Sequence, residues 1–128
     1  MPTRKDITIL IVDDYKSTLR IMRTLLKQLG FDNVEEALSV EEALKLTQVK
    51  DFGLVLCDWN MMPRTGFDLL CALRDNDGYE KPPFVMITAA NQEKEAKEAL
   101  KAGAEGQITK PFKASTLRSV LADVFAPA

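Results

Sequence analysis

Short strand-like segments alternate five times with segments of helical periodicity, and this alternation constrains the fold more than any other feature of the sequence. The strand-like segments are rich in β-branched and apolar residues, whereas the helical ones carry apolar residues three and four positions apart. Units of this kind form a parallel sheet with helices packed on its faces. The expected strands cover residues 7–12, 34–37, 54–57, 84–88 and 107–109.

Capping and turn residues mark the boundaries of the expected helices. Ser39 and Glu42 have the spacing of a capping box at the start of the second helix. Gly30 and Gly103 follow the first and fourth helices, because glycine adopts the positive φ of a helix end at low cost. The expected helices cover residues 19–29, 43–46, 66–73, 92–102 and 115–125, with a turn over 75–83.

The polarity of the strands predicts their order in the sheet. The first, third and fourth are continuous apolar runs, which is typical of strands buried on both faces. The second and fifth are more polar and suit the two edges. We therefore expect an α/β fold of the flavodoxin-like class, a doubly wound (βα)5 parallel sheet with the strand order 2-1-3-4-5.

The length and composition disfavour several classes of protein. The 128 residues, 46% hydrophobic and 28% charged, fit one globular domain over residues 1–128, and no output domain is expected. A net charge of −2 gives no basis for nucleic-acid binding, and no apolar run is long enough to span a membrane. The first residues do not have the pattern of a signal peptide, so none is expected, and Cys57 and Cys71 lack the spacing of a metal or redox motif. We expect a cytoplasmic protein with buried, inert thiols.

Chemically active residues stand at the carboxyl ends of four expected strands. Asp13 and Asp14 follow the first strand, Asp58 follows the third, Thr88 ends the fourth and Lys110 follows the fifth. Parallel strands bring these ends to one edge of the sheet, where ligands bind in open α/β folds. Each residue alone is more typical of a turn or a helix cap, so the prediction depends on their combination.

Three carboxylates beside a lysine and a hydroxyl predict a magnesium-dependent phosphoryl site. Clustered carboxylates repel one another, and a hard divalent cation relieves the repulsion. Oxygen ligands without histidine favour Mg²⁺ over zinc. Lysine and Mg²⁺ can both hold oxygens of a phosphoryl group, and an aspartate can accept that group covalently. Asp58, on the central third strand, is the best-placed acceptor.

Five segments give the sequence a specific resemblance to the receiver domains of response regulators. They are LIVDD, RTLLKQLGFDNVEEA, LCDWNM, MITAA and KAGAEGQITKPF, at residues 10–14, 23–37, 56–61, 86–90 and 101–112. Together they extend over essentially the whole chain. The resemblance is greatest to receivers of the CheY type, which act in chemotaxis.

The resemblance implies a role for each acidic residue. Asp58 resembles the phosphoryl acceptor of the family. Asp14, Asp58 and the backbone carbonyl of Asn60 resemble the direct ligands of Mg²⁺. Asp13 resembles the aspartate that reaches the metal through water.

Two further positions resemble the family, and two depart from it. Thr88 and Lys110 resemble the pair that senses the phosphoryl oxygens, and Lys110–Pro111 resembles the family's cis peptide bond. Gln107 stands where the family usually has an aromatic switch residue. We therefore expect a movement of Thr88 to be transmitted in a different way from the rotation of an aromatic ring. Pro63 lies one position later after the acceptor than usual, so we expect a different loop shape.

Partners and output follow from the resemblance as well. Receivers take their phosphoryl group from a histidine kinase or a phosphotransfer protein and hydrolyse it slowly, which makes them signalling proteins rather than enzymes with an external substrate. Because the chain has no histidine, the phosphohistidine must belong to a partner. We expect a monomer whose phosphorylation controls binding to a flagellar motor switch protein or another protein target. The implied docking surface includes Glu98, Lys101, Gln107 and Lys113.

Three other functions are compatible with parts of this pattern. A phosphorelay intermediate or phosphate sink would take up the phosphoryl group without binding the motor. A Mg²⁺-dependent aspartyl-phosphate phosphatase usually carries a second aspartate two residues after the nucleophile, where this chain has Asn60. A flavodoxin-like FMN carrier needs a phosphate-binding loop after the first strand, where Asp13 and Asp14 would repel the phosphate.

Overall fold

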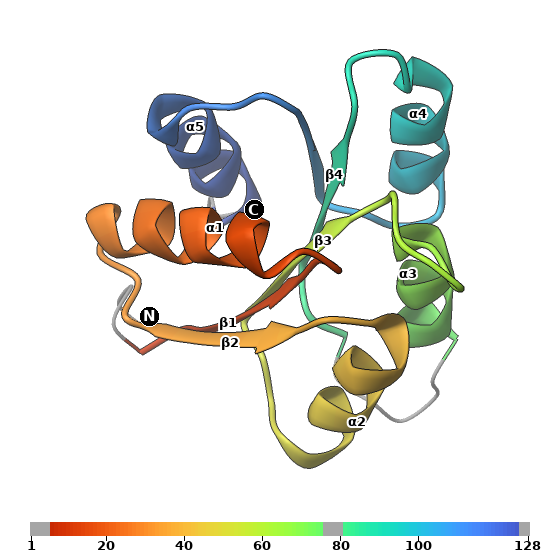
Figure 1. The fold of residues 1–128 in the computed structure, drawn as a ribbon, viewed down its shortest axis with the longest axis horizontal. Helices are drawn as coiled ribbons and strands as arrows, with labels where there is room; N and C mark the ends of the chain where they lie inside the picture. The colour runs from red at the N-terminus through yellow and green to blue at the C-terminus, as the bar shows by residue number, and fades with distance from the viewer. Residues whose placement is uncertain (1–5, 76–80, 126–128) are drawn as a thin grey trace.

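A five-stranded parallel sheet lies between two layers of helices in the computed structural model, which describes residues 6–75 and 81–125 (Figure 1). The strand order is β2-β1-β3-β4-β5, so both the predicted fold class and the predicted order are confirmed. Every pair of neighbouring strands is parallel. The strands are β1 (Thr8–Val12), β2 (Asn33–Ala37), β3 (Leu54–Asp58), β4 (Phe84–Thr88) and β5 (Gly106–Thr109).

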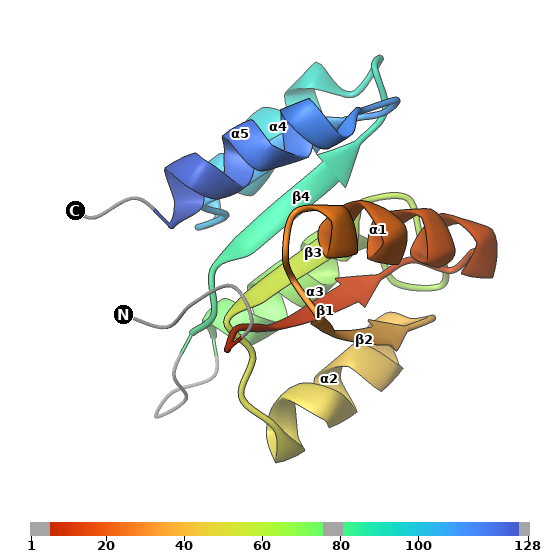
Figure 2. The same ribbon diagram turned by 90° about the vertical axis from the view of Figure 1, so that its left-hand side faces the viewer.

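Five helices in the described ranges cover the two faces of the sheet. α1 and α5 pack side by side on one face, whereas α2, α3 and α4 lie on the other (Figures 1 and 2). None of these helices is long and apolar enough to cross a membrane. The helices are α1 (Lys16–Gln28), α2 (Val40–Val49), α3 (Gly66–Arg74), α4 (Glu93–Lys101) and α5 (Ala114–Val124).

Alternation along the central strands builds a separate core on each face. In β1, Leu10 and Val12 pack with α2, α3 and α4, while Ile9 and Ile11 pack with α1 and α5. Successive side chains of a strand point to opposite faces, so an apolar strand can supply both cores. All five residues of β3 and of β4 are buried, whereas the edge strands β2 and β5 are only partly buried. Partial exposure at the sheet edges therefore explains why β2 and β5 are more polar than the central strands.

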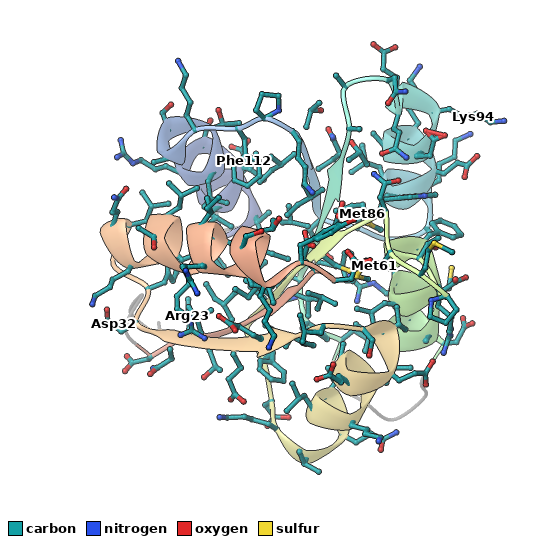
Figure 3. All side chains as sticks on the ribbon, viewed as in Figure 1. Arg23, Asp32, Met61, Met86, Lys94 and Phe112 are labelled. Carbon is teal, nitrogen blue, oxygen red and sulfur yellow. The ribbon has the colours of Figure 1, made fainter. Side chains whose placement is uncertain are left out.

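The core on the side of α3 extends to the loop that follows β3. Met61 is 3% exposed and Met86 of β4 is fully buried, and both belong to this core. Figure 3 shows the two methionines between the sheet and α3, whereas Lys94 extends from α4 into solvent. Burying a side chain of this size contributes about 1.5–3 kcal/mol. Met61 thus anchors the loop to the core close to the end of β3.

Helix ends agree with the glycine prediction and correct the capping-box prediction. Gly30 and Gly103 have φ of 95° and 109° and end α1 and α4 as expected. At α2 the Ser39 hydroxyl accepts from the Glu42 N–H at 3.1 Å, but the Glu42 carboxylate accepts from the Leu38 N–H rather than completing the box. The complete capping box opens α3 and is formed by residues 65 and 68, a threonine and an aspartate.

The other predicted boundaries are shifted by a few residues, because the ends of helices and strands depend on tertiary contacts. The shift that affects function is at Asp58, which is the last residue of β3 rather than the residue after it. In the predicted turn over 75–83, residues 76–80 lie outside the described part of the chain.

Substituting Gly66 by alanine should destabilise the fold. A Cβ at this position would lie 2.3 Å from the backbone oxygen of Asp58 and 3.0 Å from the sulfur of Met86. Helix propensity alone favours alanine in α3 by about 1 kcal/mol, but a clash with backbone cannot be relieved by a rotamer change. We expect Gly66→Ala to lower the free energy of unfolding by roughly 1–3 kcal/mol in urea titrations.

Gly106→Ala is the matched control for this substitution. Its Cβ would meet a methyl group of Val120 at 3.1 Å, and a side chain can move more easily than backbone. A smaller loss of stability is expected in this variant. Equal losses in the two variants would contradict the role assigned to the close approach between Gly66 and Asp58.

Candidate functional site

The predicted residues meet at the carboxyl edge of the sheet. Asp13 directly follows β1, Asp58 ends β3, Thr88 ends β4 and Lys110 directly follows β5. The parallel register places Asp58 beside Ile87, and the Trp59 N–H donates to the Ile87 carbonyl at 2.8 Å. Residues from four separate parts of the sequence are thus held on adjacent backbone segments.

Three carboxylates form the acidic part of the site. One oxygen from each of Asp13, Asp14 and Asp58 lies within 4.8 Å of the others. Asp13 and Asp58 are buried, at 0% and 2% exposure, whereas Asp14 is exposed. The site therefore has two fixed acidic groups inside and one at its opening to solvent.

Asp13 has one satisfied and one unsatisfied oxygen. Oδ1 accepts from the Tyr15 N–H at 2.9 Å, but Oδ2 is buried and has no hydrogen-bond partner among the described residues. Burial raises the pKa of Asp13, and the charges of Asp58 and Asp14 raise it further, against the Tyr15 hydrogen bond and Lys110. A carboxylate left in this state fits a hard cation, because Mg²⁺ takes oxygen ligands and would neutralise the repulsion.

Lys110 supplies the positive charge of the site. Its Nζ lies 3.1 Å from Asp58 Oδ2 and 3.6 Å from Asp13 Oδ2. The side chain is about one-third exposed, at 34%, so the ammonium is open to a ligand arriving from solvent. Its backbone N–H donates to the Thr88 carbonyl at 2.8 Å, and the peptide bond to Pro111 is cis, as predicted.

The loop after β3 is held to Asp58 by backbone hydrogen bonds. The Asn60 N–H donates to Asp58 Oδ1 at 3.3 Å, and the Gly66 N–H donates to the Trp59 carbonyl at 3.0 Å. The peptide bond between Met62 and Pro63 is also cis. Both carboxylate oxygens of Asp58 therefore have a donor, one from Asn60 and the other from Lys110.

Thr88 contacts Gln107 directly. Gln107 Nε2 donates to Thr88 Oγ1 at 2.7 Å and to Thr109 Oγ1 at 2.8 Å. Thr88 is 1% exposed, and Gln107 is half-buried beside it. The residue at the position of the aromatic switch is thus joined to Thr88 by a hydrogen bond.

Two residues near the site had no signal in the sequence. The Thr109 hydroxyl accepts a hydrogen bond from the same Gln107 amide nitrogen that donates to Thr88. Gln92 forms two hydrogen bonds with the side chain of Asn60. Thr109 lies in the segment 101–112 of the resemblance, but that resemblance gives it no role, and its contact with Gln107 lies within β5. Gln92 lies outside the five segments, and its contact with Asn60 joins two loops, which only the tertiary arrangement could reveal.

Both cysteines are free thiols; Cys57 is buried as predicted, whereas Cys71 is only half-buried, which corrects the prediction that both are buried. Burial raises the pKa of Cys57 well above its usual range, and the charge of Asp58 raises it further. Burial also raises the pKa of Cys71, with Asp75 and Asp68 adding to the effect. Thiols in this state are poor nucleophiles, so neither cysteine competes with the carboxylates as the reactive group.

A doubly wound sheet of this order, with aspartates at the ends of its first and third strands and a Lys–Pro after its fifth, is typical of the receiver domains of response regulators. The sequence matches the family model of the response regulator receiver domain over residues 9–122. The chain belongs to this family.

Within the family, the chain is similar to proteins of the CheY type. It is 41% identical to the chemotaxis protein CheY-3 of Vibrio cholerae serotype O1, over 94% of this chain and 93% of that protein. It is 38% identical to the chemotaxis protein CheY of Pseudomonas aeruginosa, over 91% and 94% of the two chains. The solved structure of the V. cholerae chemotaxis protein CheY4 superposes with a TM-score of 0.83 at 32% identity, over 93% and 98%.

Mg²⁺ should stabilise the folded protein through the acidic site. A ligand at a hundred times its Kd that binds only the folded state adds about 2.7 kcal/mol. We expect Asp13→Asn to lose most of this increment in thermal melts with and without Mg²⁺. In metal-free buffer the same substitution should raise the melting temperature, because the fold disfavours the charged form of Asp13.

Asp51→Asn provides the matched control for the Mg²⁺ experiment. Asp51 is an exposed aspartate that precedes β3, at the opposite edge of the sheet from the site. Its substitution should leave the Mg²⁺ increment at the wild-type value. An undiminished increment in Asp13→Asn would show that the cation binds elsewhere.

Proposed function

We propose that this receiver domain accepts a phosphoryl group on Asp58 from the phosphohistidine of a histidine kinase or a phosphotransfer protein. The single observation that carries the proposal is the Lys110 ammonium 3.1 Å from a buried Asp58 carboxylate inside the acidic trio. Two buried acidic groups beside an accessible ammonium suit a site that gains and loses a charged group.

Asp58 is the nucleophile in the proposed reaction. A carboxylate oxygen of Asp58 attacks phosphorus and forms an O–P bond, while the P–N bond to the donor histidine breaks and its electron pair returns to the ring nitrogen. Hydrolysis later transfers the phosphoryl group from Asp58 to water and releases inorganic phosphate. The domain therefore acts on itself, and we infer no reaction on an external substrate.

The other residues of the site would stabilise the negative charge of the phosphoryl oxygens, directly or by holding Mg²⁺. Lys110, which already neutralises Asp58, would shift to a phosphoryl oxygen, and the Thr88 hydroxyl would donate to another. Asp13, Asp14, Asp58 and the backbone carbonyl of Asn60 would hold Mg²⁺, directly or through water. Bound Mg²⁺ would supply positive charge to the transferring phosphoryl oxygens.

Gln107 would carry the change at Thr88 to the surface. Its amide donates to the Thr88 hydroxyl, which leaves the hydroxyl's own proton free for a phosphoryl oxygen. Gln107 also lines a cavity of about 260 Å³ with Ala90, Leu100 and Thr109, beside α4 and β5. A movement of Thr88 would thus reach a surface hollow through a single side chain.

We propose that phosphorylation controls binding of another protein at this surface. Glu98, Lys101 and Lys113 are exposed around α4, β5 and the start of α5, which gives the surface both signs of charge. Because the similar proteins are chemotaxis proteins, a flagellar motor switch protein is the first partner to test. A cytoplasmic monomer is the simplest form for this role.

A phosphorelay role can be separated from motor control by comparing partners. Phosphorylated protein should bind a motor switch protein more tightly than unphosphorylated protein does, and the difference should vanish in Asp58→Asn. Transfer of the phosphoryl group to a phosphotransfer domain, without a change in motor binding, would favour a relay or sink.

Acetyl phosphate with Mg²⁺ should add one phosphoryl group to the wild-type protein. Asp58→Asn should remain unmodified, because an amide oxygen does not form the acyl phosphate. Intact mass measurement checks the result, and Asp51→Asn should be modified like the wild type. An adduct of equal amount in Asp58→Asn would place the acceptor elsewhere and reject the proposal.

Substituting Gln107 by leucine should lower the level of phosphorylation. Leucine keeps most of the volume but removes the donor to Thr88, and one hydrogen bond of this kind corresponds to about a two- to ten-fold change in an equilibrium. The ratio of phosphorylated to unphosphorylated protein at limiting acetyl phosphate, read by intact mass, should fall by about this factor. Thr109→Val, which removes only the second contact of Gln107, should have a smaller effect.

A further inference from the structure

Two side-chain amides join the loops that follow β3 and β4. Asn60 Nδ2 donates to Gln92 Oε1 at 2.9 Å, and Gln92 Nε2 donates to Asn60 Oδ1 at 2.8 Å. Asn60 lies in the loop between β3 and α3, and Gln92 is the N-cap residue of α4. The amide pair is thus a two-bond bridge between segments 32 residues apart in the sequence.

A backbone hydrogen bond fixes the direction of the bridge. The Ala89 N–H, which can only donate, lies 2.8 Å from Gln92 Oε1. The oxygen of the Gln92 amide must therefore face Ala89, which leaves its nitrogen to donate to Asn60. Ala89 directly follows Thr88, so the bridge is attached to the end of β4.

The other end of the bridge is attached to Asp58. The backbone N–H of Asn60 donates to Asp58 Oδ1 at 3.3 Å, and the preceding residue, Trp59, is bonded to the Ile87 carbonyl at 2.8 Å. The side chain of Asn60 is thus held by Gln92, and its backbone N–H by Asp58. The backbone carbonyl of Asn60 therefore has little freedom to turn.

The exposure of the pair indicates what it does. Asn60 is exposed and Gln92 is half-buried, so neither residue belongs to the apolar cores. Exposed hydrogen bonds contribute little to global stability, but they can restrict a loop whose opening costs little free energy. The pair is placed to order the loop after Asp58 rather than to stabilise the whole domain.

We propose that Gln92 is a positioning residue, whose amide pair with Asn60 holds the Asn60 backbone carbonyl in place to receive Mg²⁺. The inference rests on the proposed function, because that carbonyl is one of the ligands assigned there. Without the pair, the loop would have to become ordered when the cation binds, and this ordering weakens binding. Gln92 would contribute to affinity without touching the cation.

A Mg²⁺ titration of the unphosphorylated protein tests the proposal. Trp59 is the single tryptophan of the chain and adjoins Asp58, so its fluorescence reports directly on the site. Gln92→Met keeps the length of the side chain but forms no amide pair, and it should raise the Kd for Mg²⁺ about three- to ten-fold. Gln48→Met, on the exposed side of α2, should leave the Kd unchanged.

A double-mutant cycle tests whether the two amides act together. Asn60→Ala retains the backbone carbonyl but removes the side chain, so it should weaken Mg²⁺ binding as Gln92→Met does. The double variant should be no weaker than either single variant, because both remove the same pair. Additive losses, or an unchanged Kd in Gln92→Met, would overturn the proposal.

Exchange of side-chain amide protons, followed by NMR in metal-free buffer, gives a readout independent of the cation. The Asn60 amide protons should exchange slowly in the wild type and faster in Gln92→Met, with an unchanged melting temperature. Equal exchange in the two proteins would also overturn the proposal. Normal Mg²⁺ binding by both proteins rejects only this inference, whereas failure of the wild type to bind Mg²⁺ rejects the proposed function too.

Discussion

Repulsion among three carboxylates at one sheet edge is the constraint on which the rest of the site depends. Burial on both faces fixes β1 and β3, so Asp13 and Asp58 cannot move apart. Lys110 offsets part of the charge, yet Asp13 Oδ2 keeps no hydrogen-bond partner among the described residues. Burial of the two apolar cores offsets the free-energy cost of this repulsion. The electrostatic balance of the site therefore changes when a charged ion or group enters it.

The contacts around Asp58 are polar and short, and they lead in two directions. Lys110 connects Asp58 to the end of β5, where Gln107 donates to the hydroxyls of Thr88 and Thr109. Asn60 connects it to the N-terminus of α4 through its amide pair. An aromatic ring reports a change by filling or leaving a volume, whereas an amide reports it by gaining or losing a hydrogen bond. The signal in this receiver should therefore depend strongly on geometry.

Sequence reasoning succeeded where a local pattern and a global rule agreed. Continuous apolar runs identified the central strands, and the rule that ligands bind at strand ends placed Asp13, Asp58 and Lys110 together. It was wrong about the capping box at Ser39, because Glu42 bonds to Leu38 instead. The complete box at the start of α3 was missed because its third position holds aspartate, whereas the expected residue is glutamate or glutamine.

The sequence by itself determined the order of the elements, the two apolar cores and the set of reactive groups, because periodicity and residue type are local properties. The tertiary structure decided the contacts of Gln107 and Gln92, and which oxygen of Asp13 has no hydrogen-bond partner among the described residues. Amide and carboxylate side chains can bond to many neighbours, so their partners depend on which loops the sheet brings side by side. That choice is made by packing across the whole domain, and no short stretch of sequence contains it.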